Sequence, residues 1–121
     1  MSSINLDEIT SKFHEGRGTT RRLEKLASSW RPGDVYTLDR LYDLVAPSSM
    51  QALSLILGEL TQRGILQQLV RVESPTGAGI KDFSSILDVP PTVHDWHSDT
   101  DIEVGPENLE VVFKVPDVSR R

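Results

Sequence analysis

The stretch between Pro47 and Glu73 places the tightest limit on what this chain can fold into. From Ser48 the sequence carries apolar residues at the spacing of a helix, and Gly64 follows where a helix of that length would end. Ile65 to Glu73 is then rich in β-forming residues and predicts a strand. A helix joined to a strand through a glycine indicates an α+β domain, and 121 residues is about the length of one domain.

Four helices are expected, and each begins at a side chain that can accept a hydrogen bond from the backbone. Their expected ranges are Asn5 to about Phe13, Thr19 to about Trp30, Thr37 to Ala46 and Ser48 to Arg63. Gly16 and Gly18 separate the first two helices, because glycine disfavours a helix interior. The fourth helix carries apolar residues on more than one face, which indicates burial on two sides or an apolar surface for a partner.

The remaining elements are expected to be short strands and loops. The expected strands are Val35 to Thr37, Ile65 to Glu73, Ile80 to Phe83, Ile102 to Val104 and Leu109 to Val115. In the second of these strands, Leu66, Val70 and Val72 share one apolar face. Residues 84–101 are expected to be irregular, because two consecutive prolines there hold an extended path. Trp30 is expected in the core.

The order of these elements over residues 19–83 resembles that of a winged-helix (winged helix-turn-helix) domain: helix, short strand, helix, turn, helix, strand, flexible tip, strand. In this comparison, Leu38–Val45 is similar to the second helix of that superfamily, Ser48–Arg63 to the third, and Ser74–Gly79 to the tip of the wing. The segment Gln62–Leu66 resembles the junction between helix and strand in the same superfamily. The resemblance implies a three-helix core followed by a small antiparallel sheet.

The same resemblance implies a division of the chain, with material added on both sides of the winged-helix core. The expected parts are an N-terminal helical segment, 1–18, the core, 19–83, an acidic extension with a final strand, 84–116, and a tail, 117–121.

Many winged helices bind DNA by placing the third helix in the major groove. Applied to this chain, the resemblance implies a dimeric, sequence-specific transcriptional regulator. Its base readers would be Ser49, Gln51 and Arg63, and its phosphate contacts would be Arg21, Arg22 and Lys25. The third helix has no arginine or lysine before Arg63, and the wing has none between Arg71 and Lys81. DNA binding is therefore the alternative hypothesis, since site-specific binders commonly contact about six to ten phosphates.

Other winged helices bind proteins, and this use suits the apolar, weakly charged third helix better. The leading hypothesis is a non-enzymatic adaptor that binds another protein or forms a homodimer. The predicted surfaces are the exposed side of the third helix, with Gln51, Ser54, Leu55, Glu59 and Gln62, and an acidic loop, with Asp95, Asp99, Asp101 and Glu103. Residues 81–121 hold nine Asp or Glu against four Lys or Arg, so a basic partner is expected for the loop.

One cluster near the C-terminus has residue types suited to a metal site. Two imidazoles, His94 and His97, with carboxylates nearby could hold zinc or another divalent ion. The alternative is a polar loop in which Asp95 and Asp99 cap turns and Trp96 packs into the core. We favour the polar loop, and we expect neither a metal nor a cofactor.

The composition restricts the chemistry further. The chain contains no cysteine, which excludes disulfides, thiolate metal sites and a cysteine nucleophile. No G-x-S-x-G sequence is present for a serine nucleophile, and we expect the protein not to be an enzyme. The sequence shows no leader pattern and no apolar run near the roughly 20 residues of a membrane span, so we expect a cytoplasmic protein without a membrane partner.

Overall fold

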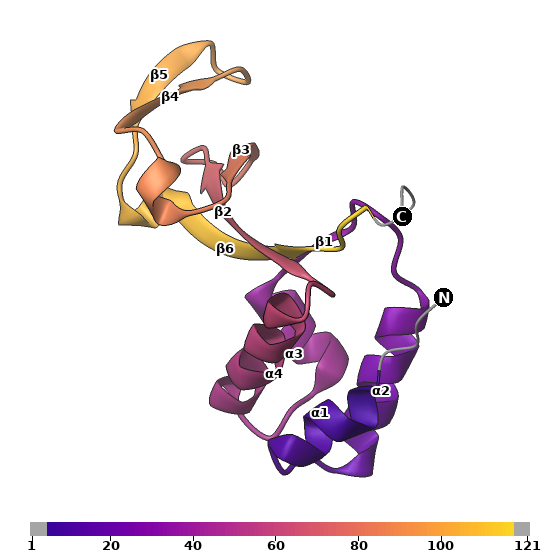
Figure 1. Ribbon diagram of the computed structural model, residues 1–121. Helices are drawn as coiled ribbons and strands as arrows, with labels where there is room; N and C mark the ends of the chain where they lie inside the picture. Colours follow the sequence, from indigo (N-terminus) through magenta and orange to yellow (C-terminus); the bar gives the residue numbers. More distant parts are fainter. Residues whose placement is uncertain (1–4, 118–121) are drawn as a thin grey trace. The chain divides into compact units, whose positions relative to one another are not determined.

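The computed structural model describes residues 5–117, whose elements make an α+β fold with four α-helices and a small antiparallel sheet (Figure 1). Contacts within the chain divide it into two units. The first unit comprises the residues up to Gln67 and those from Lys114 onward, and the second runs from Gln68 to Phe113. The α+β class predicted from the sequence is thus confirmed.

The first unit holds the four helices of the described residues. Its elements are α1 (Leu6–Lys12), α2 (Arg17–Ser28), β1 (Val35–Thr37), α3 (Leu38–Val45) and α4 (Met50–Gln62). The helices bury apolar side chains between them, among these Leu6, Ile9, Leu23, Leu41, Val45, Leu53, Ile56 and Leu60. The hydroxyls of Thr10 and Thr20 meet at 2.6 Å between α1 and α2, so the buried polar groups there are paired. Removal of this apolar surface from water is the main force that holds the unit together.

Helix α4 begins one residue later than the sequence suggested. Ser49 caps the helix, and its hydroxyl accepts a hydrogen bond from the backbone N–H of Ala52 at 3.0 Å. Ser48 instead donates from its backbone N–H and its hydroxyl to the two carboxylate oxygens of Glu15, at 2.8 and 2.5 Å. The predicted capping role of Ser48 is therefore wrong, because Glu15 engages that serine.

The end of α4 agrees with the prediction. Gly64 has a φ of +76°, in the left-handed region that favours glycine. Its N–H donates to the carbonyl of Thr61 at 3.0 Å, and the N–H of Ile65 donates to the carbonyl of Leu60 at 2.9 Å. This pair of bonds is a Schellman motif, which closes the helix and turns the chain toward the next strand.

Helix α2 is capped by Gly16, three residues before the predicted cap at Thr19, and this glycine supplies no side-chain hydrogen bond. The predicted capping role of Thr19 is therefore wrong. The Thr19 hydroxyl donates to the carbonyl of Ala46 at 3.2 Å and so connects α2 to the end of α3. Because α2 ends at Ser28, Trp30 lies beyond the helix. Trp30 is half-buried, so its predicted place in the core is only partly reached.

The second unit consists of short strands and two short 3₁₀ helices. Its elements are β2 (Gln67–Glu73), β3 (Gly79–Phe83), η1 (Ile86–Asp88), β4 (Thr92–Asp95), β5 (Thr100–Glu103), η2 (Pro106–Asn108) and β6 (Leu109–Lys114). Strands β2 and β3 are antiparallel, and the strand order of their sheet is β1-β6-β2-β3. Strand β2 begins in the first unit and β6 ends in it, so the chain passes between the units twice.

Strand β2 is covered on parts of both faces. Val72 is fully buried, as the sequence suggested, but Leu69 on the opposite face is also buried. Val70 is only half-buried, and Leu66 is buried just before the strand begins. The predicted apolar face is thus buried at Leu66 and Val72 but only in part at Val70, and Leu69 is covered on the face that the sequence predicts to be mixed.

Residues 84–101, predicted to be irregular, contain η1 and most of a hairpin. Strands β4 and β5 pair in antiparallel register, with Val93 opposite Ile102 and His94 opposite Asp101. Asp99, with a φ of +56°, takes a left-handed position just before β5. Aspartate tolerates that conformation better than most residues do. The turn of this hairpin was not predicted, because glycine is the usual sequence signal of a left-handed residue and Asp99 takes that position here.

Candidate functional site

The exposed side of α4 lies largely where the sequence placed it. The exposed side chains among the predicted ones are Gln51, Ser54, Leu55 and Gln62. Leu55 is 48% exposed, and Met50 at the start of the helix is exposed as well. Gly58 also faces open space, since an added Cβ there would meet no atom within 4 Å. These residues form an uncharged, partly apolar surface.

Glu59, the fifth residue predicted for this surface, is instead engaged within the first unit. Its carboxylate pairs with Lys12 of α1 at 3.1 Å and with Arg63 at 2.9 Å, and only 14% of its side chain is exposed. The hydrogen bond from Arg63, followed by the one from Lys12, lowers the pKa of Glu59 below its ordinary value. Glu59 therefore connects α4 to α1 and is not presented to a partner.

The residues proposed for DNA contact are mostly engaged as well. The guanidinium of Arg22 donates to the carbonyls of Val45 at 2.8 Å and Ala46 at 3.2 Å, where α3 ends. Arg63 is held by Glu59 and also lies 3.5 Å from Glu8. The Ser49 hydroxyl caps α4. Among the predicted readers and phosphate contacts, the exposed side chains without such a role in the described residues are Gln51, Arg21 and Lys25.

The acidic loop is the turn and second strand of the β4–β5 hairpin, where two carboxylates enclose one imidazole. Asp101 Oδ1 lies 2.8 Å from His94 Nδ1, and Asp99 Oδ1 lies 3.1 Å from His94 Nε2. The hydrogen bond to Asp101, and then that to Asp99, raises the pKa of His94 above its ordinary value. Both ring nitrogens can donate only in the imidazolium form, so this arrangement favours a charged His94.

This geometry does not bring the two predicted metal ligands together as a site. Both nitrogens of His94 face carboxylates, whereas a metal ligand must offer a nitrogen lone pair. His97 is exposed after β4. Within residues 5–117, no group of three or more His, Asp or Glu side chains is arranged to hold a metal ion.

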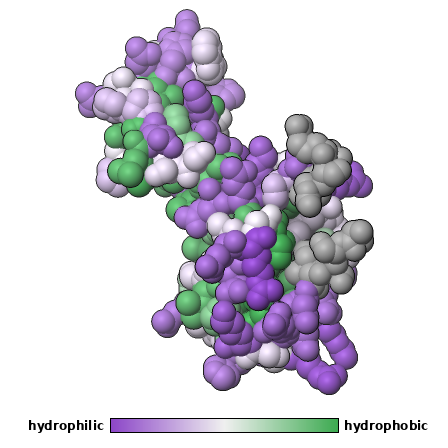
Figure 2. Space-filling view, in the orientation of Figure 1, coloured by the Kyte–Doolittle hydropathy of each residue, from purple (hydrophilic) through white to green (hydrophobic). Residues whose placement is uncertain are grey.

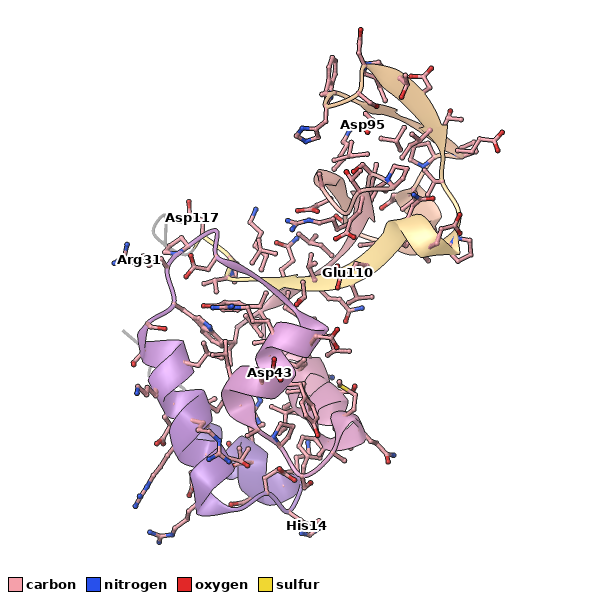
Figure 3. The ribbon with its side chains drawn as sticks, turned by 180° about the vertical axis from the view of Figure 1, so that it is seen from behind. His14, Arg31, Asp43, Asp95, Glu110 and Asp117 are labelled. Atoms are coloured by element: carbon pink, nitrogen blue, oxygen red, sulfur yellow. The ribbon has the colours of Figure 1, made fainter. Side chains whose placement is uncertain are left out.

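Asp95, labelled in Figure 3, is the last residue of β4, and its carboxylate bonds to the hairpin turn and does not face the exposed surface where the sequence placed it. It is 3% exposed, and its carboxylate accepts hydrogen bonds from the His97 N–H at 2.9 Å and the Ser98 hydroxyl at 3.0 Å. Burial would raise the pKa of Asp95, but these hydrogen bonds outweigh it and hold the pKa below its ordinary value. The prediction that Asp95 caps a turn agrees with these bonds, whereas Asp99 pairs with His94. Glu103 is exposed at the end of β5.

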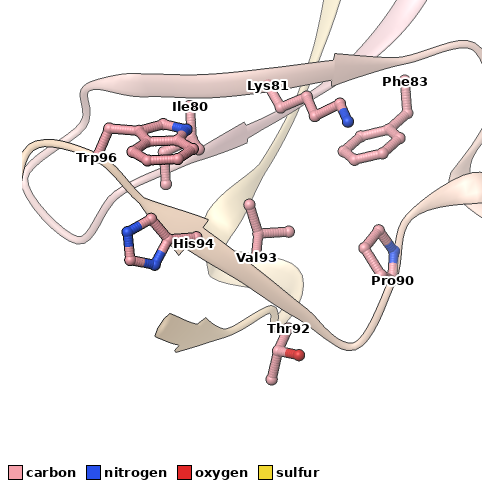
Figure 4. A pocket seen from close by; sticks show the side chains of 8 residues that line it. All are labelled: Ile80, Lys81, Phe83, Pro90, Thr92, Val93, His94 and Trp96. Carbon is pink, nitrogen blue, oxygen red and sulfur yellow. The ribbon is translucent and has the colours of Figure 1, made fainter. Parts of the chain in front are cut away.

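An open groove of about 270 Å³ lies between β3 and β4 within the second unit (Figure 4). The side chains that line it are Ile80, Lys81, Phe83, Pro90, Thr92, Val93, His94 and Trp96. The rings of Trp96 and His94 meet edge to face, with centroids 4.6 Å apart. The Lys81 ammonium lies 5.4 Å from the centre of the Phe83 ring. The groove is thus mainly apolar, with Lys81 toward one end and His94 with its two carboxylates at the other.

Large apolar side chains are exposed in the second unit. Trp96 is 78% exposed, so its predicted place in the core is wrong, and Leu87 and Ile86 of η1 are 91% and 54% exposed. Green apolar surface is visible among the hydrophilic surface of this unit in Figure 2. The same unit holds nine Asp or Glu and two Lys or Arg, a net charge of −7. Of the two basic residues, Arg71 is paired with Asp82 at 2.7 Å.

The groove was missed by reasoning from the sequence. Its walls come from two strands that pair with different neighbours, and no local pattern in Ile80–Phe83 or Thr92–Asp95 indicates that they lie side by side. A usable signal was the group of Trp96 and two histidines amid carboxylates, because exposed aromatic residues are enriched at binding surfaces.

Comparison with known proteins gives no relative for this chain. It matches no protein-family model, and neither the curated proteins nor the solved structures include a significant match. In the described part of the chain, no helix has the length and apolar character needed to cross a membrane.

Proposed function

We propose that the chain is a non-enzymatic interaction module that binds a basic segment of another protein through its second unit. The observation that carries this proposal is the position of Trp96, which is 78% exposed beside an apolar groove in a unit of net charge −7. Exposed apolar surface of this kind marks sites of association. The surrounding carboxylates favour a cationic partner and repel phosphate backbones.

We further propose that residues 19–83 follow the winged-helix plan. The order α2, β1, α3, α4, β2, β3 supports this proposal, with the tip of the wing at residues 74–79 between β2 and β3. Under this plan, α4 is the third helix of the domain. Its uncharged exposed side, with Leu55 and Met50, is then a second surface for a protein or for another copy of the chain.

The alternative function, sequence-specific DNA binding by a dimer, draws on the same plan. The exposed cations of α2, Arg21 and Lys25, favour it. Arg22 and Arg63 are already bonded within the first unit, which leaves few cations for phosphate contacts. Protein binding is therefore the function that we place first.

A selection from phage-displayed random peptides, with the full chain as bait, tests the leading proposal. We expect basic peptides with apolar residues to be enriched. Fluorescence polarisation would then give their dissociation constants. The double variant Asp99→Asn/Asp101→Asn should weaken binding about tenfold, because two exposed charges beside the groove are lost.

The matched control is the double variant Glu24→Gln/Asp43→Asn, which removes the same charge from exposed positions of the first unit. It should change the affinity less than about twofold if the second unit is the binding site. Failure to enrich any peptide, or equal losses in both double variants, would overturn the proposal. The chain is also titrated with a duplex DNA of random sequence at several salt concentrations. An affinity for the duplex that falls steeply as salt rises would support the alternative, DNA binding.

A further inference from the structure

We infer that the second unit binds its partner as an extended strand along the free edge of β3, with a partner arginine stacked on Trp96 and paired with Asp99 or Asp101. This inference rests on the proposed function and specifies the conformation and chemistry of the ligand. It depends on three features of the second unit: a sheet edge, an apolar groove beside the edge strand, and a difference in charge between the two ends of the groove.

The first feature is the sheet edge. Strand β3 stands last in the order β1-β6-β2-β3, so among the described strands it is hydrogen-bonded on one side only. Strand β4, across the groove, pairs only with β5. The outer edge of such a strand presents backbone N–H and C=O groups, and an extended peptide can satisfy them as an added strand.

The second feature is the position of the groove relative to β3. The pairing of β2 with β3 shifts register at Ile80, which is the extra residue of a bulge. Lys81 and Phe83, two positions apart, share one face of β3. Both line the groove with Ile80, and Val93 of β4 lines it from the other side. The groove therefore lies against that face of β3. Alternate side chains of a strand added at the edge of β3 would point to the same face and reach these apolar groups.

The third feature is the contrast between the ends of the groove (Figure 4). Trp96 and His94 lie at one end, and Phe83 and Pro90 lie at the other, near Lys81. At the Trp96 end, Asp99 and Asp101 flank His94, and their side chains are 90% and 75% exposed. The two carboxylates outnumber the one histidine ring, so this group keeps a net negative charge whether or not His94 is protonated, and this end attracts a cation.

An arginine suits the Trp96 end better than a lysine does. Its planar guanidinium stacks on an indole and pairs with a carboxylate in a fixed geometry. At the opposite end, the Lys81 ammonium repels a second cation, and the ring of Phe83 with Pro90 offers an apolar contact. The expected ligand is therefore an extended segment with an arginine at one end and a branched or aromatic residue about four positions away, roughly the length of β3.

Backbone methylation of the ligand tests the inference without altering the protein. The probe is the tightest peptide from the phage selection, synthesised in two forms that carry N-methyl groups on alternate amides. One form blocks the amides that face β3 and should bind about tenfold more weakly or worse, whereas the other should lose less than about threefold. Hydrogen exchange measured by NMR should show new protection of β3 amides only in the complex.

A double-mutant cycle tests the arginine contact. Trp96→Ala removes a side chain that is 78% exposed, so it should leave the fold intact. It should weaken the parent peptide about threefold to fivefold, and should have little effect on a peptide whose arginine is replaced by norleucine. Trp96→Phe should restore part of the loss.

The outcomes separate the two levels of the proposal. A selection that enriches no peptide would overturn the proposed function itself. Enriched peptides that bind equally well in both methylated forms, with β3 amides unprotected, would overturn the edge-strand mode and leave protein binding in place. The absence of coupling between Trp96 and the arginine would overturn the arginine assignment.

Discussion

The two units of the chain use their charged side chains in opposite ways. In the first unit, Arg22 bonds to the carbonyls at the end of α3, and Glu59 is held between Lys12 and Arg63. In the second unit, Asp99 and Asp101 surround one histidine and remain largely exposed. The number of charged residues in a segment therefore says little about how many of them are free to meet a partner. Several charges of the first unit join its helices, whereas Asp99 and Asp101 of the acidic second unit face water.

The largest expected effect is on the free energy of unfolding, and it should appear when a packed side chain is truncated but not when an exposed one of similar size is. Ile56 of α4 is fully buried, whereas Leu87 of η1 is 91% exposed. Ile56→Ala should lower the free energy of unfolding by about 2–5 kcal/mol, because it opens a cavity in the first unit. Leu87→Ala should change it by less than about 0.5 kcal/mol. Urea unfolding followed by circular dichroism measures both, and a large loss at Leu87 would contradict the contrast between the units.

A smaller effect tests whether Arg22 stabilises the fold. Arg22→Ala removes the hydrogen bonds to the carbonyls of Val45 and Ala46, and should lower the free energy of unfolding by about 1–2 kcal/mol. Arg21→Ala, at an exposed position on the same helix, should stay within about 0.5 kcal/mol of the parent. Equal stabilities of the two variants would show that Arg22 is available to a ligand after all.

Two glycines with opposite roles, Gly58 within α4 and Gly64 just beyond its end, give effects of opposite sign. Gly64→Ala places a side chain at a φ of +76° and should lower the free energy of unfolding by about 1 kcal/mol. Gly58 lies within the helix, and a Cβ added there would meet no neighbouring atom. Gly58→Ala should therefore raise the free energy of unfolding by about 0.5–1 kcal/mol. Thermal unfolding of both variants at one pH distinguishes the two. Destabilisation at Gly58 would indicate a close neighbour there.

The smallest effect concerns pH and the second unit. His94 has a raised pKa in the folded state, so its stabilising contribution is complete below the ordinary histidine pKa and is lost as pH rises through the raised value. An NMR titration of the His94 ring should give a pKa above the ordinary value. Asp101→Asn should lower that pKa more than Asp99→Asn does, since the hydrogen bond to Asp101 is the larger cause. A pKa unchanged in both variants would contradict the paired geometry.

Local signals predicted much of the first unit. Asn5 and Thr37 accept the expected capping hydrogen bonds from Glu8 and Arg40, and Gly64 ends α4. These features depend on residues a few positions apart, which is why the sequence reveals them. The prediction for Ser48 failed because its partner, Glu15, is distant in the sequence.

The hairpin and the groove could not be predicted in the same way. Thr92–Asp95 and Thr100–Glu103 each carry a single strongly apolar residue, so their alternation is too weak to indicate strands. The pairing of His94 with Asp101 depends on cross-strand register, and the groove depends on β3 lying beside β4. Trp96 was expected to be buried from its residue type alone, whereas its surroundings leave it exposed.

The second unit is one continuous segment, Gln68 to Phe113, with both of its ends joined to the first unit. A protease that cuts once in the tip between β2 and β3 would give two fragments, and each would carry part of both units. The N-terminal piece would keep β2 attached to α4, and the C-terminal piece would keep β3 to β6 attached to the residues from Lys114 onward. The pieces of a nicked molecule could separate only after β6 left its neighbouring strands and Val115 left the first unit.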